Sequence, residues 1–379
     1  MIPEAFALPE GQIYLLGHSL GPAPRTALDA VRRAAEHEWA QGLAASWNDA
    51  DWFHAPRRLG DKIARIMQAP AGSVIVTDSV SVNVFKLAAA ALVLSSRRTI
   101  RVEAETFPTD GYVAQSLADL RGDVRVERVA RGALFADIGA DVGLILASQI
   151  DFRTGAAFEL EAMTAQARRA GARVLWDLSH SLGAVVVEAD AIELAVGCGY
   201  KYLNGGPGAP GWIYAAPALA DALANPIAGW FGHAAPFAFE PDYRPAPGAQ
   251  RFAAGTPPIL SFAALEAALD VVLSVAPRAV AAHAQHLCAT FRDALGDALT
   301  CITPAAHGAH LAFTHPQAFA LKTALIEAGI VGDFRPPDAI RFGFSPLFLN
   351  EADAIEAARI VGDVTAKPLA ASEARGVVT

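Results

Sequence analysis

The feature that most constrains the fold is a regular alternation of two kinds of segment between residues 57 and 215. One kind is short, apolar and rich in Val, Ile and Leu, which is typical of buried strands. These predicted strands cover residues 73–77, 99–104, 142–148, 173–177, 191–196 and 211–215. The other kind has helical spacing and covers residues 57–67, 81–94, 110–120 and 159–170. Because such an alternation needs crossover connections, it predicts an α/β fold with a mainly parallel or mixed sheet covered by helices on both faces.

The sequence changes character after residue 215. Residues 225–258 are rich in Pro and show no clear periodicity, and a loop of this length in a compact chain is usually functional. A long helix predicted at residues 260–275 then leads into a smaller set of elements. Its predicted helices and strands cover residues 280–294, 311–314, 318–328, 340–344 and 351–361. We therefore expect a large α/β domain followed by a smaller α+β domain.

Composition argues against several kinds of partner. The formal net charge is −9 and no basic run is longer than two residues, so nucleic acid is not expected as a partner. Although 53% of the residues are hydrophobic, the longest apolar run, residues 87–94, is far shorter than the ~20 residues of a spanning helix. We therefore expect no membrane association. Three cysteines without metal-ligand spacing predict neither a disulfide framework nor a zinc site, and they fit a reducing cytoplasm.

Two short windows gather the residue types of a reactive site. Asp177 ends a predicted central strand and His180 follows closely, while Tyr200 and Lys201 come just after the next predicted strand, among several glycines. Ligands in open α/β sheets bind beyond the carboxyl ends of the strands, so Asp177 and Lys201 are expected to face one crevice. A lysine amine loses its proton readily once it is desolvated, which favours Schiff-base chemistry at Lys201.

Two other strand ends carry candidate groups. Residues 77–83 combine hydroxyl side chains with the free backbone N–H groups of a predicted helix start, which is a ready anion site. Phe107, Thr109 and Asp110 follow the next predicted strand, so an aromatic face and a carboxylate project into the same crevice. For Asp110 alone, helix capping is the favoured interpretation, because Asp is among the best capping residues.

The smaller domain contributes one clear candidate. Arg341 lies in an apolar predicted strand, where a charge needs a partner. A salt bridge and a fork for a substrate carboxylate are equally supported interpretations. The histidines of this domain have no carboxylate or cysteine at ligand spacing, and we interpret them as surface or satisfied core residues. They are His283, His286, His307, His310 and His315.

Motifs of several large enzyme classes are missing from the sequence. It contains no Walker or His-Glu-x-x-His motif, so a P-loop enzyme and a zincin are not supported. A lysine, a carboxylate, an aromatic ring and an anion site in one α/β domain instead match the needs of pyridoxal phosphate. This cofactor requires an amine for its aldehyde, a carboxylate for its pyridine nitrogen, an aromatic face for its ring and a cup for its phosphate.

Seven motifs in a fixed order make the chain resemble the kynureninases, pyridoxal-phosphate enzymes of the aspartate-aminotransferase fold type, or fold type I. They cover residues 77–83, 107–110, 151–155, 176–181, 200–204, 229–233 and 255–258. The resemblance extends from the glycine-rich turn at residues 16–21 to the strand of Arg341. It implies a mostly parallel, seven-stranded sheet in a large cofactor-binding domain of residues 46–258. Residues 1–45 would pack with a small domain of residues 259–379.

The resemblance also implies a role for each matching residue of the cofactor site. Lys201 would form the Schiff base with pyridoxal phosphate, Asp177 would pair with the pyridine nitrogen, and Phe107 would stack on the ring. The other implied cofactor-binding residues are Val80, Ser81 and Tyr200 at the phosphate, Asp110 and His180 around the ring, and Thr109. Tyr200 is also the candidate for proton transfer, because a phenol can donate without carrying charge.

Further residues are implied for the substrate and for a second subunit. Arg341 would bind the substrate α-carboxylate, and His18 and Trp47 lie in segments that would border the aryl pocket. Trp230 and Thr256 would reach the neighbouring subunit's site and bind the cofactor there, with Thr256 also at the substrate, which implies a homodimer with shared active sites. The resemblance also implies that threonine at position 256, where asparagine goes with the 3-hydroxylated substrate, favours L-kynurenine. Two departures from the family pattern are His18, where asparagine is usual, and Val80, where threonine is common.

The implied reaction belongs to tryptophan catabolism: hydrolysis of the Cβ–Cγ bond of L-kynurenine to anthranilate and L-alanine. Two alternatives remain open at this point. The first is another pyridoxal-phosphate enzyme of the same fold, such as an aminotransferase or a desulfurase-like lyase acting on a different amino acid. The second is a regulatory protein that has kept the fold without the cofactor.

Overall fold

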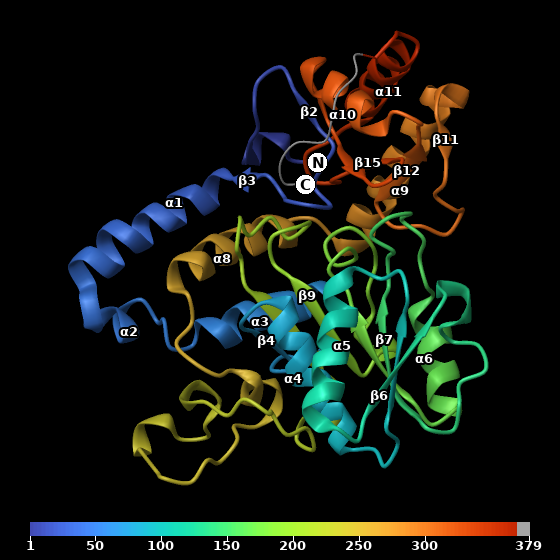
Figure 1. Ribbon diagram of the computed structural model, residues 1–379. Helices are drawn as coiled ribbons and strands as arrows, with labels where there is room; N and C mark the ends of the chain where they lie inside the picture. The colour runs from blue at the N-terminus through green and yellow to red at the C-terminus, as the bar shows by residue number, and fades with distance from the viewer. Residues whose placement is uncertain (370–379) are drawn as a thin grey trace.

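The computed structural model describes residues 1–369, with a large lower part and a smaller upper part in Figure 1. The large part is built on a seven-stranded sheet with the order β4-β10-β9-β8-β7-β5-β6. Its strands are β4 (Val74–Val76), β5 (Thr99–Glu103), β6 (Arg125–Val129), β7 (Val142–Ser148), β8 (Arg173–Asp177), β9 (Leu194–Cys198) and β10 (Gly211–Ala215). The strands from β9 to β6 are mutually parallel, and β10 is antiparallel to both β9 and β4. The prediction of a mostly parallel, seven-stranded sheet is confirmed.

Helices cover both faces of this sheet. Val174 and Trp176 of β8 pack in the same cluster as residues of α3, α6 and α8, whereas Leu175 packs with residues of α4 and α5. Since alternate side chains of a strand point to opposite faces, these two clusters mark the two covered faces. The helices are α3 (Ala55–Ile66), α4 (Val80–Val93), α5 (Pro108–Arg121), α6 (Leu160–Arg169) and α8 (Ile259–Leu273). Burial on both faces explains why the strands are continuously apolar.

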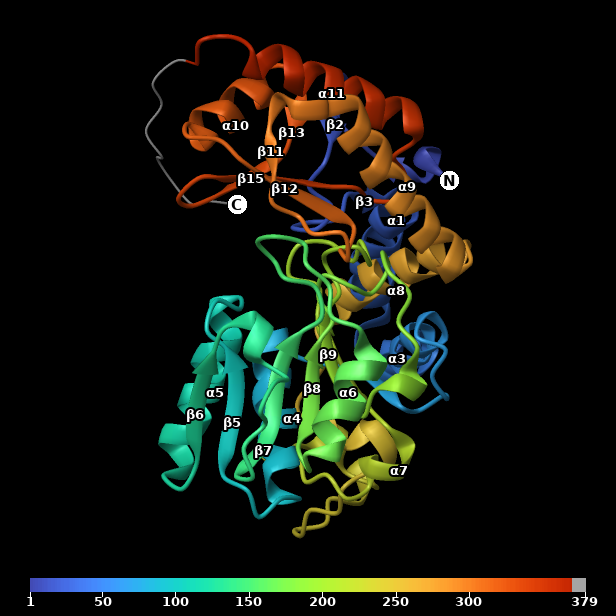
Figure 2. The same ribbon diagram turned by 90° about the vertical axis from the view of Figure 1, so that its right-hand side faces the viewer.

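The smaller part contains a four-stranded antiparallel sheet of order β11-β12-β15-β14. Figure 2 shows its helices on the side away from the large sheet, so the opposite side of the small sheet turns toward the large part. The strands are β11 (Thr300–Cys301), β12 (His310–Thr314), β14 (Asp333–Arg335) and β15 (Ala339–Gly343). The helices are α9 (Pro277–Leu295), α10 (Ala318–Glu327) and α11 (Glu351–Thr365).

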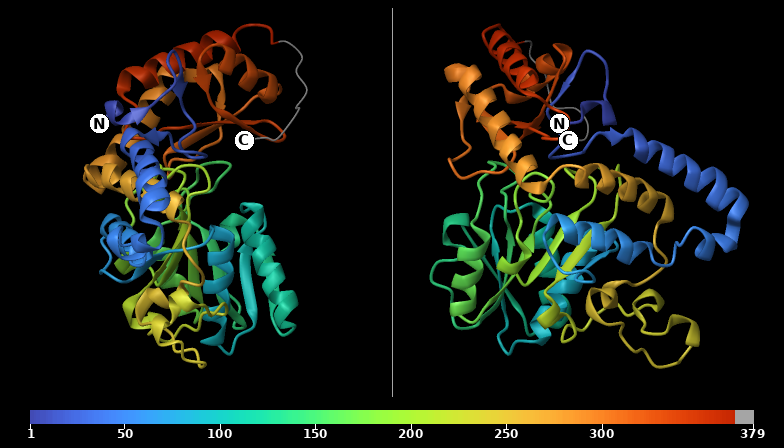
Figure 3. Two further views of the ribbon diagram at one scale, coloured as in Figure 1. Left: turned by 90° about the vertical axis from the view of Figure 1, so that its left-hand side faces the viewer. Right: turned by 180° about the vertical axis from the view of Figure 1, so that it is seen from behind.

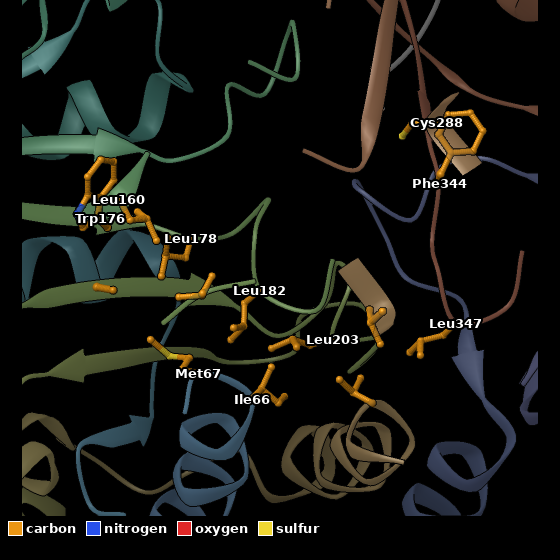
Figure 4. Packing of buried hydrophobic residues seen from close by; sticks show 14 of the residues in the cluster. Ile66, Met67, Leu160, Trp176, Leu178, Leu182, Leu203, Cys288, Phe344 and Leu347 are labelled. Carbon is orange, nitrogen blue, oxygen red and sulfur yellow. The ribbon is translucent and has the colours of Figure 1, made fainter. Parts of the chain in front are cut away.

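One hydrophobic cluster connects the two parts. Figure 4 shows this cluster from Trp176 and Leu178 in the large part, through Leu203, to Phe344 and Leu347 in the small part. All of these side chains are at most 1% exposed. The two parts therefore share a packed interior.

The N-terminal segment crosses from one part to the other. Strand β2 (Ile13–Tyr14) pairs with β13 (Ile330–Val331), and β1 (Phe6–Ala7) pairs with β3 (Ala23–Pro24). Helix α1 (Arg25–Arg33) packs along α8 and continues as a π-helix over Ala34–Gly42. Figure 3 shows this long helix beside α8. The domain boundaries after residues 45 and 258 stay predictions.

Short elements occupy the remaining connections. They include α2 (Ser46–Asp49), α7 (Pro217–Ala220) and the 3-10 turns Trp230–Gly232, Pro236–Ala238 and Gly248–Phe252. Part of the aperiodic stretch 225–258 projects from the body of the molecule in Figure 3, whereas Ala249 and Phe252 within it are buried in the core of the large part. Within residues 1–369 no single helix has the length and hydropathy to cross a membrane, although the sharply bent pair Ile259–Leu273 and Pro277–Ala298 meets both criteria together.

Candidate active site

The carboxyl ends of β8 and β9 bring the central candidates together. Asp177 is the last residue of β8 and Lys201 follows β9, its parallel neighbour. Lys201 Nζ lies 2.9 Å from Nε2 of His180, and the Ser179 backbone N–H donates to Asp177 Oδ1 at 2.8 Å. Burial, followed by the charge of Lys201, lowers the pKa of His180 well below its ordinary value. His180 is therefore a neutral imidazole beside an amine.

Asp110 lies next to this group. It is 2% exposed, and burial followed by the charge of Asp177 raises the pKa of its carboxyl well above the ordinary value. The capping interpretation of Asp110 is wrong: α5 begins at Pro108, its N-cap is Phe107, and no side chain caps this end. The carboxyl of Asp110 instead accepts a hydrogen bond from Thr106 Oγ1 at 3.4 Å.

The aromatic candidate Phe107 is half exposed at the start of the same helix. Its ring meets the ring of Phe152 edge-on, with the centroids 5.5 Å apart and an interplanar angle of 84°. Thr109 is partly buried in the first turn of α5. The structure thus groups Phe107, Thr109 and Asp110 at one helix start near Asp177 and Lys201.

The predicted anion site lies at the start of α4. A cavity of about 430 Å³ is lined by Val80, Ser81, Tyr200 and Thr256, among others. Burial, followed by the neighbouring Cys198, raises the pKa of Tyr200, which is therefore a neutral phenol. Hydroxyl groups, a phenol and a helix N-terminus around one cavity can bind a phosphate.

Lys86 was not predicted as a site residue from the sequence, and it stabilises the turn that precedes α4. It is fully buried on α4 and donates to Asp78 and to the backbone carbonyl of Phe252, the latter at 2.7 Å. Asp78 has a positive φ of 44° in the turn before α4. The lysine therefore links the turn before α4 to the stretch that carries Thr256. The signal in the sequence that could have revealed Lys86 is a charged residue within an apolar helical pattern.

In the small domain, Arg341 is 1% exposed and is held by a carboxylate that the sequence analysis missed. Its Nε donates to Asp333 Oδ1 at 2.8 Å, and Nη2 donates to the other oxygen of Asp333. Nη1 donates to the Phe152 carbonyl. Burial alone would raise the pKa of Asp333, but the adjacent His18 ring and the hydrogen bonds and charge of Arg341 hold it well below its ordinary value. The salt-bridge interpretation of Arg341 is confirmed, and a carboxylate-binding role stays a prediction.

Three buried histidines lie between Arg341 and Lys201. The rings of His18 and His310 stack at 4.9 Å with an interplanar angle of 13°, and His180 lies 6.3 and 5.7 Å from them. The interpretation of His310 as a satisfied or surface residue is wrong, because it is buried and neither ring nitrogen has a hydrogen-bond partner. No group of three or more His, Cys, Asp or Glu suited to a metal occurs in residues 1–369.

The turn that carries His18 touches both parts of the site. The backbone N–H of Gly21 donates to the Tyr200 carbonyl at 2.8 Å, and Gly343 N–H donates to the Leu15 carbonyl at 2.6 Å. A Cβ at Gly21 would lie 2.3 Å from the Lys201 carbonyl oxygen, so only glycine fits there. The turn therefore connects the loop that carries Lys201, called the lysine loop below, to β15.

Trp47 and Trp230 lie in an aromatic cluster at the edge of the cavity. Their ring centroids are 6.4 Å apart, and Trp47 also lies 6.1 Å from Phe231, which lines the cavity. Trp230 is 41% exposed. The structure thus brings Trp47 to Trp230 and Phe231 and places His18 in the histidine group, so the two residues predicted to border the aryl pocket lie in different surroundings.

Curated relatives match almost the whole chain. A kynureninase of Deinococcus radiodurans is 44% identical over 363 residues, which cover 92% of this chain and 88% of the relative. A kynureninase of Pseudomonas fluorescens is 38% identical over 378 residues, which cover 95% of this chain and 91% of the relative. The chain belongs to the kynureninase family. The family model for the kynureninase C-terminal domain matches residues 278–361, the region of His310, Asp333 and Arg341.

Solved structures of other enzymes share this kynureninase fold. The cystine C-S lyase C-DES, in complex with cysteine persulfide, gives a TM-score of 0.83 at 19% identity and covers 93% of this chain and 98% of its own. The cysteine desulfurase CsdA from Escherichia coli gives 0.78 at 18% identity and covers 96% and 97%. At these identities the likeness concerns the fold, which is that of fold type I.

Proposed function

We propose that this kynureninase-family chain hydrolyses the Cβ–Cγ bond of L-kynurenine, giving anthranilate and L-alanine, with pyridoxal phosphate as cofactor. The observation that carries the proposal is the amine of Lys201 beside neutral His180, at the strand ends that also hold Asp177. This arrangement supplies the amine and the carboxylate that the cofactor needs. The family relationship favours kynurenine over the substrates of other enzymes on this fold.

The residues at the site fit pyridoxal phosphate. The cup at Val80 and Ser81 offers a helix N-terminus to a phosphate, and Phe107 offers a half-exposed ring to the pyridine face. The Nδ1 of His180 is buried without a hydrogen-bond partner among the described residues, which suits a polar group bound beside it. When bound, the cofactor supplies an electron sink for the carbanion that forms at the substrate α-carbon.

The chain's own groups would then bind the substrate and move its protons. Lys201 would take the α-proton, and His180 would accept a hydrogen bond from the Lys201 amine at 2.9 Å. Asp177 would hold the pyridine N–H, and neutral Tyr200 would donate a proton near the phosphate. Asp333 and Phe152 leave one N–H on each terminal nitrogen of Arg341, which can receive the substrate carboxylate.

The direct test is to assay the purified holoenzyme with L-kynurenine. Equal amounts of fluorescent anthranilate and of alanine are expected, with a higher kcat/KM for kynurenine than for 3-hydroxykynurenine. An aminotransferase would instead form a keto acid, and a desulfurase-like lyase would release sulfide from cysteine. Either of those products without anthranilate would rule out the proposal.

We also propose a cytoplasmic homodimer whose active sites include Trp230 and Thr256 of the neighbouring subunit. In support, the 225–258 stretch exposes large aromatic side chains: Trp230 is 41%, Phe237 64% and Phe239 86% exposed. Exposed aromatic residues are enriched at protein interfaces.

The cysteines support the cytoplasmic location. Buried, unpaired Cys198 and Cys288 fit a reducing compartment, and fractionation of cells that express the chain at native level tests this location.

A complementation experiment tests the shared sites. Chains with Lys201→Ala are mixed, by co-expression, with chains in which Thr256→Trp blocks the cavity. If the sites are shared, a mixed dimer contains one site with both changes and one site with neither, so anthranilate formation returns. Each variant alone stays inactive. Mixed dimers as inactive as the parents would show that each chain builds its site alone.

A further inference from the structure

We propose that His310 and His18, stacked beside Arg341, form part of the site for the substrate α-carboxylate, with His310 donating a hydrogen bond to it. This inference rests on the proposed function, because it concerns the same substrate. It adds a residue that the sequence analysis dismissed, and it places His18 at the carboxylate end of the substrate instead of the aryl end.

The strand register places His310 and Arg341 on one face of the small sheet. Arg341 pairs with both Ala312 and Asp333, and His310 pairs with Gly343. Side chains two residues apart on a strand share a face, so His310 and Arg341 both project toward His180, whose ring lies 5.7 Å from His310. A substrate that reaches from Lys201 to Arg341 must therefore pass the His18–His310 stack.

Hydrogen-bonding groups in this stack lack partners. Both ring nitrogens of His18 and His310, and Nδ1 of His180, are buried without a hydrogen bond to any residue of the described chain. Buried polar groups are almost always paired in native proteins, so several orphans in one place indicate a bound polar group. The nearest carboxylate, Asp333, lies 3.7 Å from His18 Nε2, too far for a normal hydrogen bond.

The balance of charge indicates which polar group this is. Asp333 is shared between two guanidinium groups, Arg341 and Arg335, the latter at 3.0 Å. One carboxylate for two arginines leaves a positive charge that an incoming carboxylate would neutralise. Burial, followed by Arg341, lowers the pKa of His18 to about 4, and burial followed by His18 lowers the pKa of His310. The two imidazoles therefore add N–H donors without adding charge.

The backbone makes room for the stack. A Cβ at Gly343 would lie 2.0 Å from His18 Nδ1, so the absence of a side chain at this position lets the ring lie against β15. His18 in turn covers one face of the His310 ring. This packing fixes the His310 ring beside Arg341, as a hydrogen bond of defined direction requires.

The test compares His310→Leu with His310→Gln in the holoenzyme. Losing a hydrogen bond to a charged group is expected to raise the KM for L-kynurenine about 10-fold or more in the leucine variant, with a much smaller change in kcat. The Kd of L-alanine, measured by calorimetry, should rise in parallel. The glutamine variant keeps a donor and should retain values close to wild type. His286→Leu, at an exposed histidine of α9, is the control and should match wild type.

Two outcomes would overturn the inference. The KM and the Kd of His310→Leu could both match wild type, or the glutamine variant could be as impaired as the leucine variant, which would mean that the imidazole only fills space. If His310→Leu does not fold, the glutamine variant and histidine ring ¹⁵N shifts of the wild type decide instead. Addition of L-alanine should shift a resonance that His310→Gln lacks, and no shift would refute the contact. Absence of anthranilate from the wild type would reject the proposed function separately.

Discussion

Replacing Lys201 with alanine is expected to reduce anthranilate formation by about 10⁴-fold or more, because proton transfer at the α-carbon loses its base as the cofactor loses its amine. The purified variant should also lack the visible absorption of the lysine-bound cofactor. Its fold should be intact, since Lys201 is only partly buried and its amine contacts a histidine instead of a buried charge. Anthranilate fluorescence and an absorption spectrum measure the two effects.

Lys322→Ala is the matched control for this variant. Lys322 lies on α10 in the small domain, with its amine 4.9 Å from the centre of the Phe319 ring, and no role is proposed for it. This variant should keep the wild-type rate and spectrum. If Lys201→Ala formed anthranilate at the control's rate, Lys201 could not be the residue that holds the cofactor.

The second large effect is expected from Asp333→Ala. This change leaves the guanidinium groups of Arg341 and Arg335 without their shared carboxylate in a buried site. Breaking a buried ion pair by removing one partner costs about 3–5 kcal/mol, so the free energy of unfolding should fall by that amount. The KM for L-kynurenine should rise as well, because Arg341 loses the contact that fixes its orientation. Urea unfolding and steady-state kinetics measure the two effects.

Glu356→Ala provides the contrast, because Glu356 pairs with Arg359 on the exposed face of α11. Exposed ion pairs contribute little, so its unfolding curve should stay near wild type. If Asp333→Ala and Glu356→Ala lowered the free energy of unfolding equally, burial would not make the Asp333 ion pairs more stabilising than an exposed pair.

Acid sensitivity gives Asp333 a signature of its own. Folding lowers the pKa of this carboxyl from its ordinary value of 3.8, so its stabilising contribution is fully present above that pH. The contribution decreases as the pH falls below that value toward the lower pKa of the folded state. Asp333→Asn should therefore flatten the pH dependence of stability below about pH 4. An unchanged slope would show that other carboxyls account for the acid transition.

The local sequence pattern was sufficient to predict several strands of the large domain and the two central site residues. Strands β7, β8 and β10 were predicted to the residue, because each is a continuous apolar run between polar turns. Strand β6 was missed because it lies at the sheet edge and three of its five residues are charged (Arg-Val-Glu-Arg-Val), so it has no continuous apolar run. Asp177 and Lys201 were found because strand ends in such a sheet point to one crevice.

The small-domain half of the site depended on pairing that no local pattern contains. Arg341 stood out as a charge in an apolar strand, but its partner Asp333 lies on a different strand, and only the register of β14 with β15 joins them. His310 likewise reaches the site only through its pairing with Gly343. The Asp110 error has a local cause, since a shift of the helix start to Pro108 moves this residue from the cap into the first turn.

The turn at residues 15–21 has a mechanical consequence. It is bonded at one end to β15 of the small domain, through Leu15 and Gly343, and at the other to the lysine loop of the large domain, through Gly21 and Tyr200. Because both ends of this short turn are hydrogen-bonded, the two domains can rotate about it but cannot move far apart. We call the turn a tether for this reason. Closure of the small domain over a substrate is therefore expected to be a pivot about this turn. The Gly21 and Gly343 amides should then exchange with solvent equally slowly with and without L-alanine, and fast exchange in the free enzyme would show that the tether opens.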